Sequence, residues 1–119
     1  MMTKKSKAAN AIRLHLRLRI AGREKIALGP GKVELLALLD ETGSITEAAR
    51  RMKMSYMKAW SLIQTMKPLV HCSRGGGTGG GARLTAGGHE ALALYRKMET
   101  DSLHACHGSW EKLQLLFKT

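Results

Sequence analysis

A run of glycines from Gly75 to Gly81 constrains this chain more than any other feature of its sequence. Six of those seven residues are glycine, and short extended segments flank them at 69–74 and 82–85. Glycine adopts the backbone conformations that close tight turns. The sequence therefore predicts a β-hairpin with almost no side chains at its tip. The region 43–66, just before the hairpin, reads as two short helices joined by a tight turn.

Capping residues mark where these two helices begin and end. Ser44 is followed three residues later by Glu47, which is the spacing of a capping box, and Ser55 has the side chain to cap the second helix. Pro68 disfavours helical geometry in the residue before it, so this helix is expected to end near Met66. The order helix, turn, helix, hairpin is the plan of a winged helix-turn-helix. We therefore expect a mainly α fold with a small β component and a long C-terminal helix.

The flanking segments are expected to support this unit. Apolar and basic residues alternate strictly from Ile12 to Ile20, which predicts a strand with one buried and one solvated face. The solvated face either contacts DNA backbone or protects a sheet edge with positive charge; it consists of Arg13, His15, Arg17 and Arg19. Residues 31–42 predict a first helix. Residues 86–106 predict a long fourth helix, which Thr85 caps and Gly108 breaks.

Apolar positions within the helices predict the core. Each helix has a set of apolar residues at spacings that bring them to one side. These are Val33, Leu35, Leu36, Leu38 and Leu39 in the first helix, Ile45, Ala48, Ala49 and Met52 in the second, and Met57, Ala59, Trp60, Ile63 and Met66 in the third. Leu92, Leu94, Tyr95 and Met98 give the fourth helix an apolar side.

The length of 119 residues leaves room for one compact domain. We expect a flexible basic arm at 1–11, a winged-helix DNA-binding domain at 12–107 and a C-terminal helix at 108–119. Positive and negative charges balance over 86–119, and the last segment is rich in leucine. The C-terminal helix is therefore either a dimerisation element or a segment that folds back on the domain's own core.

The net charge of +11 is unevenly distributed. Residues 1–25 contain eight Lys or Arg against one Glu, and residues 44–85 contain seven against one. Residues 26–43 carry a net charge of −2. Charge that serves only solubility is spread more evenly and mixed in sign. The distribution therefore indicates a polyanionic partner, most simply double-stranded DNA.

The third helix and the hairpin supply the candidate DNA contacts. One α-helix fits the major groove, with its N-terminal end at the base edges. Lys58 is suited to phosphate or guanine, and Gln64 either reads adenine or is a solvated surface residue. Arg50 and Arg51 suit backbone phosphates. The full candidate set is Arg50, Arg51, Ser55, Tyr56, Met57, Lys58, Ser61, Gln64, Thr65, Arg74, Gly76, Gly77, Thr78, Gly79 and Arg83.

The glycine run itself has three interpretations. A nucleotide-binding loop would continue with Lys followed by Ser or Thr, whereas this run continues with Ala82 and Arg83. A wing tip fits better, because glycine lets backbone N–H groups approach phosphates, with Arg74 and Arg83 as charged anchors. The alternatives are a loop without function at the tip and, for the whole unit, a generic three-helix bundle.

Other classes of function have weaker support in the sequence. No catalytic triad, Cys-His pair or carboxylate pair stands out, so neither an enzyme nor a cofactor is expected. His104, Cys106 and His107 resemble metal-ligand material, but their spacing is loose. The two cysteines are expected to be reduced. No membrane span or signal-peptide segment is present, which predicts a cytoplasmic protein.

The sequence also resembles a known family of regulators. The match is carried by Ser55-Tyr56, Ala59-Trp60, Ile63 and Met66, by the polyglycine hairpin, and by Leu84-Thr85 followed by Gly88. Over roughly residues 12–105 these features are similar to the N-terminal DNA-binding domain of the ModE family of molybdate-responsive transcription regulators. A more distant similarity to LysR-type regulators covers only the helix-turn-helix.

The ModE resemblance implies a winged-helix homodimer that binds operator DNA. Proteins of this family also carry C-terminal β-rich domains that bind molybdate. This sequence stops at Thr119, before any such domain, so direct molybdate binding is not expected of these residues. The alternative functions are a metal or small-ligand sensor, a protein-interaction module, and a non-specific nucleic-acid binder.

Overall fold

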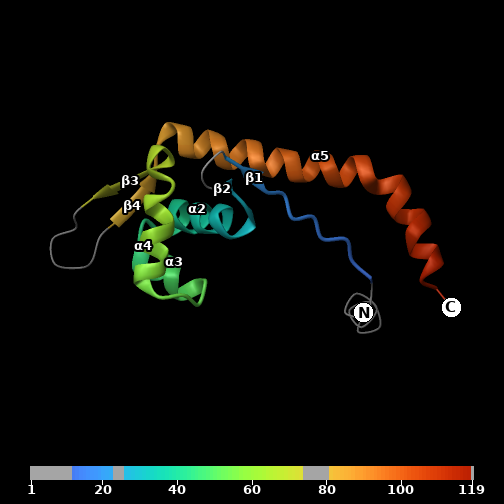
Figure 1. The fold of residues 1–119 in the computed structure, drawn as a ribbon, viewed down its shortest axis with the longest axis horizontal. Helices are drawn as coiled ribbons and strands as arrows, with labels where there is room; N and C mark the ends of the chain where they lie inside the picture. The colour runs from blue at the N-terminus through green and yellow to red at the C-terminus, as the bar shows by residue number, and fades with distance from the viewer. Residues whose placement is uncertain (1–11, 23–25, 74–80, 119) are drawn as a thin grey trace. The chain divides into compact units, whose positions relative to one another are not determined.

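A computed structural model of the chain describes residues 12–22, 26–73 and 81–118. The elements follow in the order β1 (Ile20–Ala21), β2 (Ile26–Leu28), α2 (Pro30–Thr42), α3 (Ile45–Arg51), α4 (Tyr56–Gln64), the 3₁₀ turn η1 (Lys67–Leu69), β3 (Val70–Ser73), β4 (Gly81–Leu84) and α5 (Ala86–Leu116) (Figure 1). The chain divides into a unit of residues 17–98 and a second unit to which residues 99–118 belong. The expected mainly α fold with a small β component and a long C-terminal helix is confirmed.

Backbone chemistry sets both ends of α2. Pro30 occupies the first turn, where a missing N–H group costs nothing, and Gly29 precedes it in extended geometry. At the other end Gly43 adopts a left-handed conformation with φ of 67°, and its N–H donates to Leu39 O at 2.8 Å. Both end positions therefore follow the asymmetry expected of proline and glycine around a helix.

Each helix of the helix-turn-helix begins at a serine cap. Ser44 Oγ accepts the Glu47 N–H at 3.0 Å, and Ser55 Oγ accepts the Lys58 N–H at 3.0 Å, as expected. Between the two helices Lys53 adopts a left-handed conformation with φ of 56°. This conformation lets the next N–H, that of Met54, donate to Ala49 O at 3.0 Å. The predicted helix-turn-helix is therefore present, with α4 ending at Gln64, two residues earlier than expected.

The predicted hairpin forms from β3 and β4, which pair antiparallel in the register Val70–Leu84 to Ser73–Gly81. Gly81 also bridges to Ser44, and Ala82 N–H donates to Gly43 O at 3.3 Å. The first residues of β4, at the end of the ladder next to the tip, are therefore hydrogen-bonded to the segment that opens α3. The tip, residues 74–80, lies outside the described residues.

The core lies among α2, α3, α4 and the hairpin. Its buried members are Leu28, Val33, Leu35, Leu36, Leu39, Ile45, Ala48, Ala49, Ala59, Ile63, Met66, Val70, Ala82, Leu84 and Tyr95. The expected core positions of α2 and α3 are confirmed, with Leu38 and Met52 half-buried. Ala48, Ala49 and Ala59 are small, which permits the close approach of α3 and α4.

The start of α5 is fixed by an exceptionally close contact at Gly88. Thr85 Oγ1 accepts the Gly88 N–H at 3.0 Å and donates to Pro68 O at 2.8 Å. A Cβ at position 88 would lie 2.1 Å from Leu69 O, so only glycine fits there. Further along, the buried Tyr95 donates its hydroxyl to Leu18 O at 2.6 Å.

The break predicted at Gly108 is wrong, because α5 runs without interruption from Ala86 to Leu116. One glycine inside a helix costs only about 1 kcal/mol relative to alanine. Long stretches of helix-forming residues on both sides offset that cost.

The strand predicted from Ile12 to Ile20 is also wrong for most of its length. Only Ile20–Ala21 pairs, with β2, which is three residues long. The exposure pattern nevertheless alternates as expected: Leu14, Leu16 and Leu18 are half-buried, and the basic residues between them are exposed. The alternation therefore predicts correctly which side chains are solvated. It does not predict the length of the ladder, because the partner strand β2 has only three residues.

Among the described residues, no helix is long and apolar enough to cross a membrane.

Candidate nucleic-acid interface

The outer surface of α4 is the centre of the candidate site. Tyr56, Met57, Lys58, Ser61 and Thr65 are exposed there, and Gln64 is half-buried. The Ser55 cap is also exposed, so both the cap and the first turn of the helix face solvent. The candidate residues of this helix therefore lie on an accessible surface that carries hydroxyl groups, one amide and one positive charge.

Two residues assigned to the core of α4 are instead exposed, so that part of the prediction is wrong. Met57 has an exposed fraction of 65% and Trp60 of 41%. The buried positions Ala59, Ile63 and Met66 follow at intervals of four and three, which defines the inner stripe. Trp60 is turned by about 100° from that stripe, and Met57 lies nearly opposite it.

Arg50 and Arg51 are engaged by carboxylates on the protein itself. Arg50 Nε donates to Glu47 Oε1 at 2.9 Å. Arg51 Nε lies 3.3 Å from Glu47 Oε2, and its Nη1 lies 3.3 Å from Glu41 Oε1. The hydrogen bond from Arg50 lowers the pKa of Glu47 from 4.5 to about 2, with Arg51 adding to the effect. Phosphates would therefore compete with Glu47 for both guanidinium groups.

Sequence reasoning gave Glu47 a different role. In a capping box its side chain would accept the Ser44 N–H, but that N–H donates to Thr42 Oγ1 at 3.2 Å instead. The observed ion pairs could be predicted from the sequence, because Arg50 and Arg51 follow Glu47 by three and four residues, which is the spacing of neighbours on a helix.

The hairpin presents one further candidate on a solvated face. Arg83 is exposed and pairs directly with the exposed His71 across the ladder, while its neighbours Ala82 and Leu84 are buried. The other candidates in the wing are Arg74, Gly76, Gly77, Thr78 and Gly79, which lie outside the described residues.

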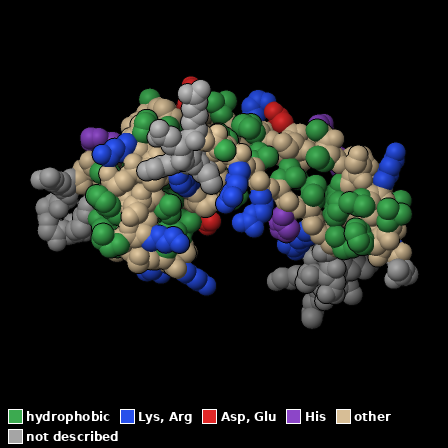
Figure 2. Space-filling model, viewed as in Figure 1, with side chains coloured by type: hydrophobic (Ala, Val, Ile, Leu, Met, Phe, Trp, Pro, Cys, Tyr) green, Lys and Arg blue, Asp and Glu red, His purple; other side chains and the backbone are tan. Residues whose placement is uncertain are grey.

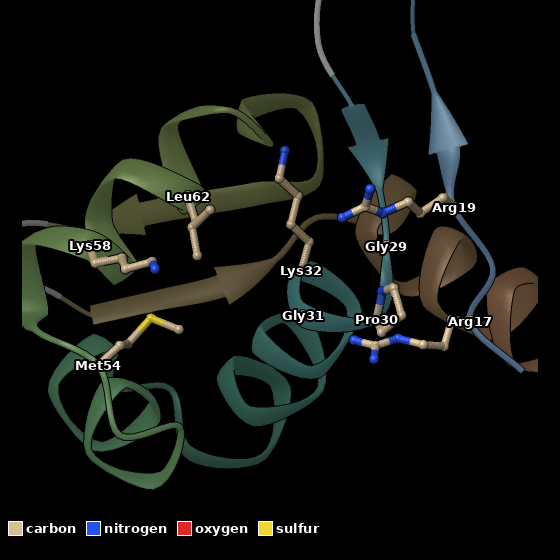
Figure 3. Close-up of a pocket in the computed structure, with 9 residues that line it drawn as sticks. All are labelled: Arg17, Arg19, Gly29, Pro30, Gly31, Lys32, Met54, Lys58 and Leu62. Atoms are coloured by element: carbon tan, nitrogen blue, oxygen red, sulfur yellow. The ribbon is translucent and has the colours of Figure 1, made fainter. Parts of the chain in front are cut away.

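A cavity of about 590 Å³ adjoins α4 and was not found from the sequence. Figure 3 shows Lys58, Leu62 and Met54 on one side of it and Arg17 and Arg19 on the other. The first turn of α2 completes the lining with Gly29, Pro30, Gly31 and Lys32. Four of these described lining residues are basic and none is acidic. Three separate segments build this groove, so only folding brings its charges together.

The distribution of charge over the visible face agrees with that asymmetry. Figure 2 shows blue Lys and Arg side chains at several places on the unit that contains α4, with few red acidic ones between them. Such a surface attracts polyanions over distances of about 10 Å at moderate salt.

The candidate metal ligands do not form a recognisable site in the part of the chain that the structure describes. His104 and His107 are exposed on α5, and Cys106 is half-buried. His107 Nε2 lies 2.8 Å from Glu111 Oε1. No group of three or more His, Cys, Asp or Glu side chains in the described ranges is arranged to hold a metal ion. Cys72 and Cys106 are not joined in a disulfide.

The fold and this surface define a class: a mainly α chain with a helix-turn-helix, a small hairpin, a long C-terminal helix and a basic outer face. No protein-family model matches the chain. The ModE transcriptional regulator of Haemophilus influenzae is 35% identical over 95 residues, which are 76% of this chain and 37% of that protein.

Two further relatives are similar to this chain over a comparable number of residues. The molybdenum-pterin-binding protein MopB of Rhodobacter capsulatus is 42% identical over 77 residues, which are 60% of this chain and 28% of that protein. The molybdenum transport protein ModE of Azotobacter vinelandii is 37% identical over 92 residues, which are 73% of this chain and 34% of that protein. The chain is therefore a ModE-like homologue, and it spans about a third of the length of the curated relatives it matches.

Proposed function

We propose that this chain is a transcription regulator of the ModE type that binds operator DNA as a homodimer through a winged helix. The observation that carries the proposal is the exposed polar face of α4, directly after a capped turn and beside the hairpin. Relatives named as ModE transcriptional regulators support a regulatory role.

In the proposed complex, α4 enters the major groove with its first turn toward the base edges. Lys58, Ser61 and Gln64 are the residues proposed to contact bases, with Tyr56 and Met57 beside them. Arg83 and the glycine-rich wing grip backbone phosphates, with Arg74 at the wing's edge. Arg50 and Arg51 reach phosphates only by giving up part of their pairing with Glu47.

The dimer is proposed to form through residues 108–119. Large apolar side chains remain exposed near the end of α5, namely Leu113, Leu115, Leu116 and Phe117. Figure 2 shows hydrophobic side chains gathered at the right-hand end of the view, over this part of the helix. Contiguous apolar surface of this kind is characteristic of interaction sites.

The relatives' names also suggest which genes the protein regulates. Two of them are named for molybdenum transport or molybdenum-pterin binding. We propose that the operators of this chain lie beside genes for molybdenum handling. A genome-wide map of binding sites tests this, and sites without enrichment near such genes contradict it.

The test of DNA binding selects duplexes from a random pool with the wild-type protein and then measures affinity as salt is raised. We expect the logarithm of the binding constant to fall linearly with the logarithm of salt concentration. A salt-insensitive affinity, or equal affinity for selected duplex, scrambled duplex and RNA, contradicts the proposal.

Two substitutions separate base reading from phosphate binding. Lys58→Ala is expected to change the ranking of sites, at a cost of about 1–3 kcal/mol at the preferred base. Arg83→Ala is expected to weaken binding to all duplexes alike and to reduce the salt slope by about 0.9. The opposite assignment of these two effects contradicts the proposed roles.

A further inference from the structure

The basic groove beside α4 has the charge and the position of a second DNA contact. Its positive charges come from Arg17 and Arg19 just before β1, from Lys32 in α2 and from Lys58 in α4 (Figure 3). We infer that this groove binds the sugar-phosphate backbone of the same duplex whose major groove receives α4. The inference rests on the proposed function and adds Arg17 and Arg19 to the DNA-binding residues.

Three of the four basic side chains in the groove, those of Arg17, Arg19 and Lys58, are available to an external anion. Arg17, Arg19 and Lys58 form no ion pair or side-chain hydrogen bond with any other described residue, in contrast to Arg50 and Arg51. Because no lining carboxylate competes for them, a phosphate entering the groove meets uncompensated positive charge. Clefts lined by one sign of charge concentrate the field and attract the opposite sign.

Contacts with other parts of the fold hold the backbone that carries the two arginines. Tyr95 holds the backbone between them through its hydrogen bond to Leu18 O. Ile20 pairs with Leu28, which brings Arg19 opposite Gly29. A Cβ at position 29 would lie 3.6 Å from Arg19 Cγ, so this side chain lies across the glycine backbone. Preorganised charges lose less entropy when they bind.

The groove also contains the N-terminal end of α2. Gly29 provides no side-chain cap for α2, and the first N–H groups of a helix have no partner within it. These groups and the helix dipole favour an anion. They add to the charged groove and are not the basis of the inference.

The location of Lys58 connects the groove to the proposed reading helix. It lies in the first turn of α4 and also lines the groove. Phosphates border the major groove on both sides, so a duplex that receives α4 brings backbone close to that turn. Phosphate contacts of this kind fix register and orientation without reading sequence.

The test compares the double variant Arg17→Gln, Arg19→Gln with a control of equal charge, Arg96→Gln, Lys97→Gln, at two exposed positions of α5 outside the groove and outside residues 108–119. The probe is a duplex selected from a random pool by the wild-type protein, together with a scrambled duplex. We expect the first variant to reduce the salt slope by about 1 per lost contact and to weaken binding to both duplexes alike. The control is expected to leave slope and affinity unchanged.

Three outcomes overturn the inference. One is an unchanged slope in the arginine variant while the wild type binds DNA normally. Another is an equal loss in the α5 control, which would assign the effect to net charge. The third is loss of inorganic pyrophosphate binding, measured by thermal shift, without any change in DNA binding, which would make the groove a site for a free anion. If the wild type binds no DNA, the proposed function itself fails, which is a separate result.

Folding of the variants is checked by circular dichroism and thermal melting. Arg17 and Arg19 are exposed, so we expect unchanged melting. A second variant, Tyr95→Phe, keeps all four charges and removes the hydrogen bond to Leu18. We expect it to weaken DNA binding while keeping the wild-type salt slope. A reduced salt slope in this variant contradicts the separate roles of charge and position.

Discussion

At the scale of single residues, Gly88 is the position where the backbone approaches most closely. Leu69 O lies where a Cβ would be, at 2.1 Å, and Leu84 Cβ is 3.1 Å away. Because the obstacle is backbone and not the end of a flexible side chain, alanine there must displace α5 or η1. We expect Gly88→Ala to reduce the free energy of unfolding by about 1–3 kcal/mol, as overpacking does, measured by urea denaturation.

The neighbouring Gly87 provides the control. A Cβ at Gly87 has its nearest contact at 3.6 Å, with Thr85 Oγ1, which is ordinary van der Waals distance. Gly87→Ala is therefore expected to be neutral or slightly stabilising. Equal destabilisation by both substitutions would argue against a specific contact at Gly88.

Glu47 gives a prediction about pH. Its pKa is lowered to about 2, mainly by the hydrogen bond from Arg50. A lowered folded-state pKa means that the ion pair stabilises the fold fully above the ordinary value of 4.5, and that this stabilisation is lost as pH falls toward 2. We expect the Glu47 carboxyl resonance to titrate near pH 2 in the wild type and closer to 4.5 in Arg50→Gln.

The control for that titration is Lys112→Gln, which removes a positive charge that takes no part in lowering the pKa of Glu47. It is expected to leave the Glu47 midpoint unchanged. A wild-type midpoint near 4.5 would mean that Arg50 does not hold Glu47 in solution, and both arginines would then be freer for phosphate than proposed.

At the scale of elements, the continuity of α5 through Gly108 gives a third prediction. A Cβ at Gly108 would meet nothing within 4 Å. Alanine there keeps the helix and removes the entropic cost of glycine, so Gly108→Ala is expected to stabilise the helix by about 1 kcal/mol. Thermal melting followed at 222 nm measures this. A lower melting temperature would indicate that Gly108 faces a partner that needs the space.

Signals between residues close in sequence predict where most of the helices begin and end. Ser44, Ser55 and Thr85 cap helices as expected, and Gly43 ends α2, because each signal acts within a few residues. The strand from Ile12 failed for the opposite reason, since a ladder needs a partner that is distant in sequence. Periodicity alone also does not orient α4, because it predicts Met57 and Trp60 in the core and both are exposed.

The candidate site was predictable only in part. The exposed face of α4 follows from its place in the helix-turn-helix. The groove joins Arg17, Arg19, Lys32 and Lys58 from three segments, and no spacing in the sequence encodes their approach. The position of Glu47 fits a capping box with Ser44 and helical ion pairs with Arg50 and Arg51 equally well, and the structure has the ion pairs.

At the scale of the whole molecule, the proposed dimer gives a fourth prediction. Leu116 and Phe117 have exposed fractions of 78% and 58%, and a second copy would remove them from water. The double variant Leu116→Glu, Phe117→Glu is expected to be monomeric by light scattering and to bind the selected duplex more weakly. In a dimer the two reading helices would lie about 34 Å apart, so the sites should be palindromic.

The matched control is Leu94→Glu, which introduces charge at another exposed position of α5, outside residues 108–119. It is expected to leave the oligomeric state unchanged. A monomeric wild type contradicts the dimer, and an unchanged dimer in the double variant contradicts the assignment of the interface to 108–119.

The contact at Gly88 also has an evolutionary consequence. Among descendants of this fold, drift at Gly87 and Gly108 is tolerated, because a side chain at either position meets open space or ordinary contact. Position 88 has no such freedom, since every other residue collides with Leu69 O. Purifying selection should therefore keep a glycine three residues after the threonine that caps α5, even in lineages whose reading helix has changed its target.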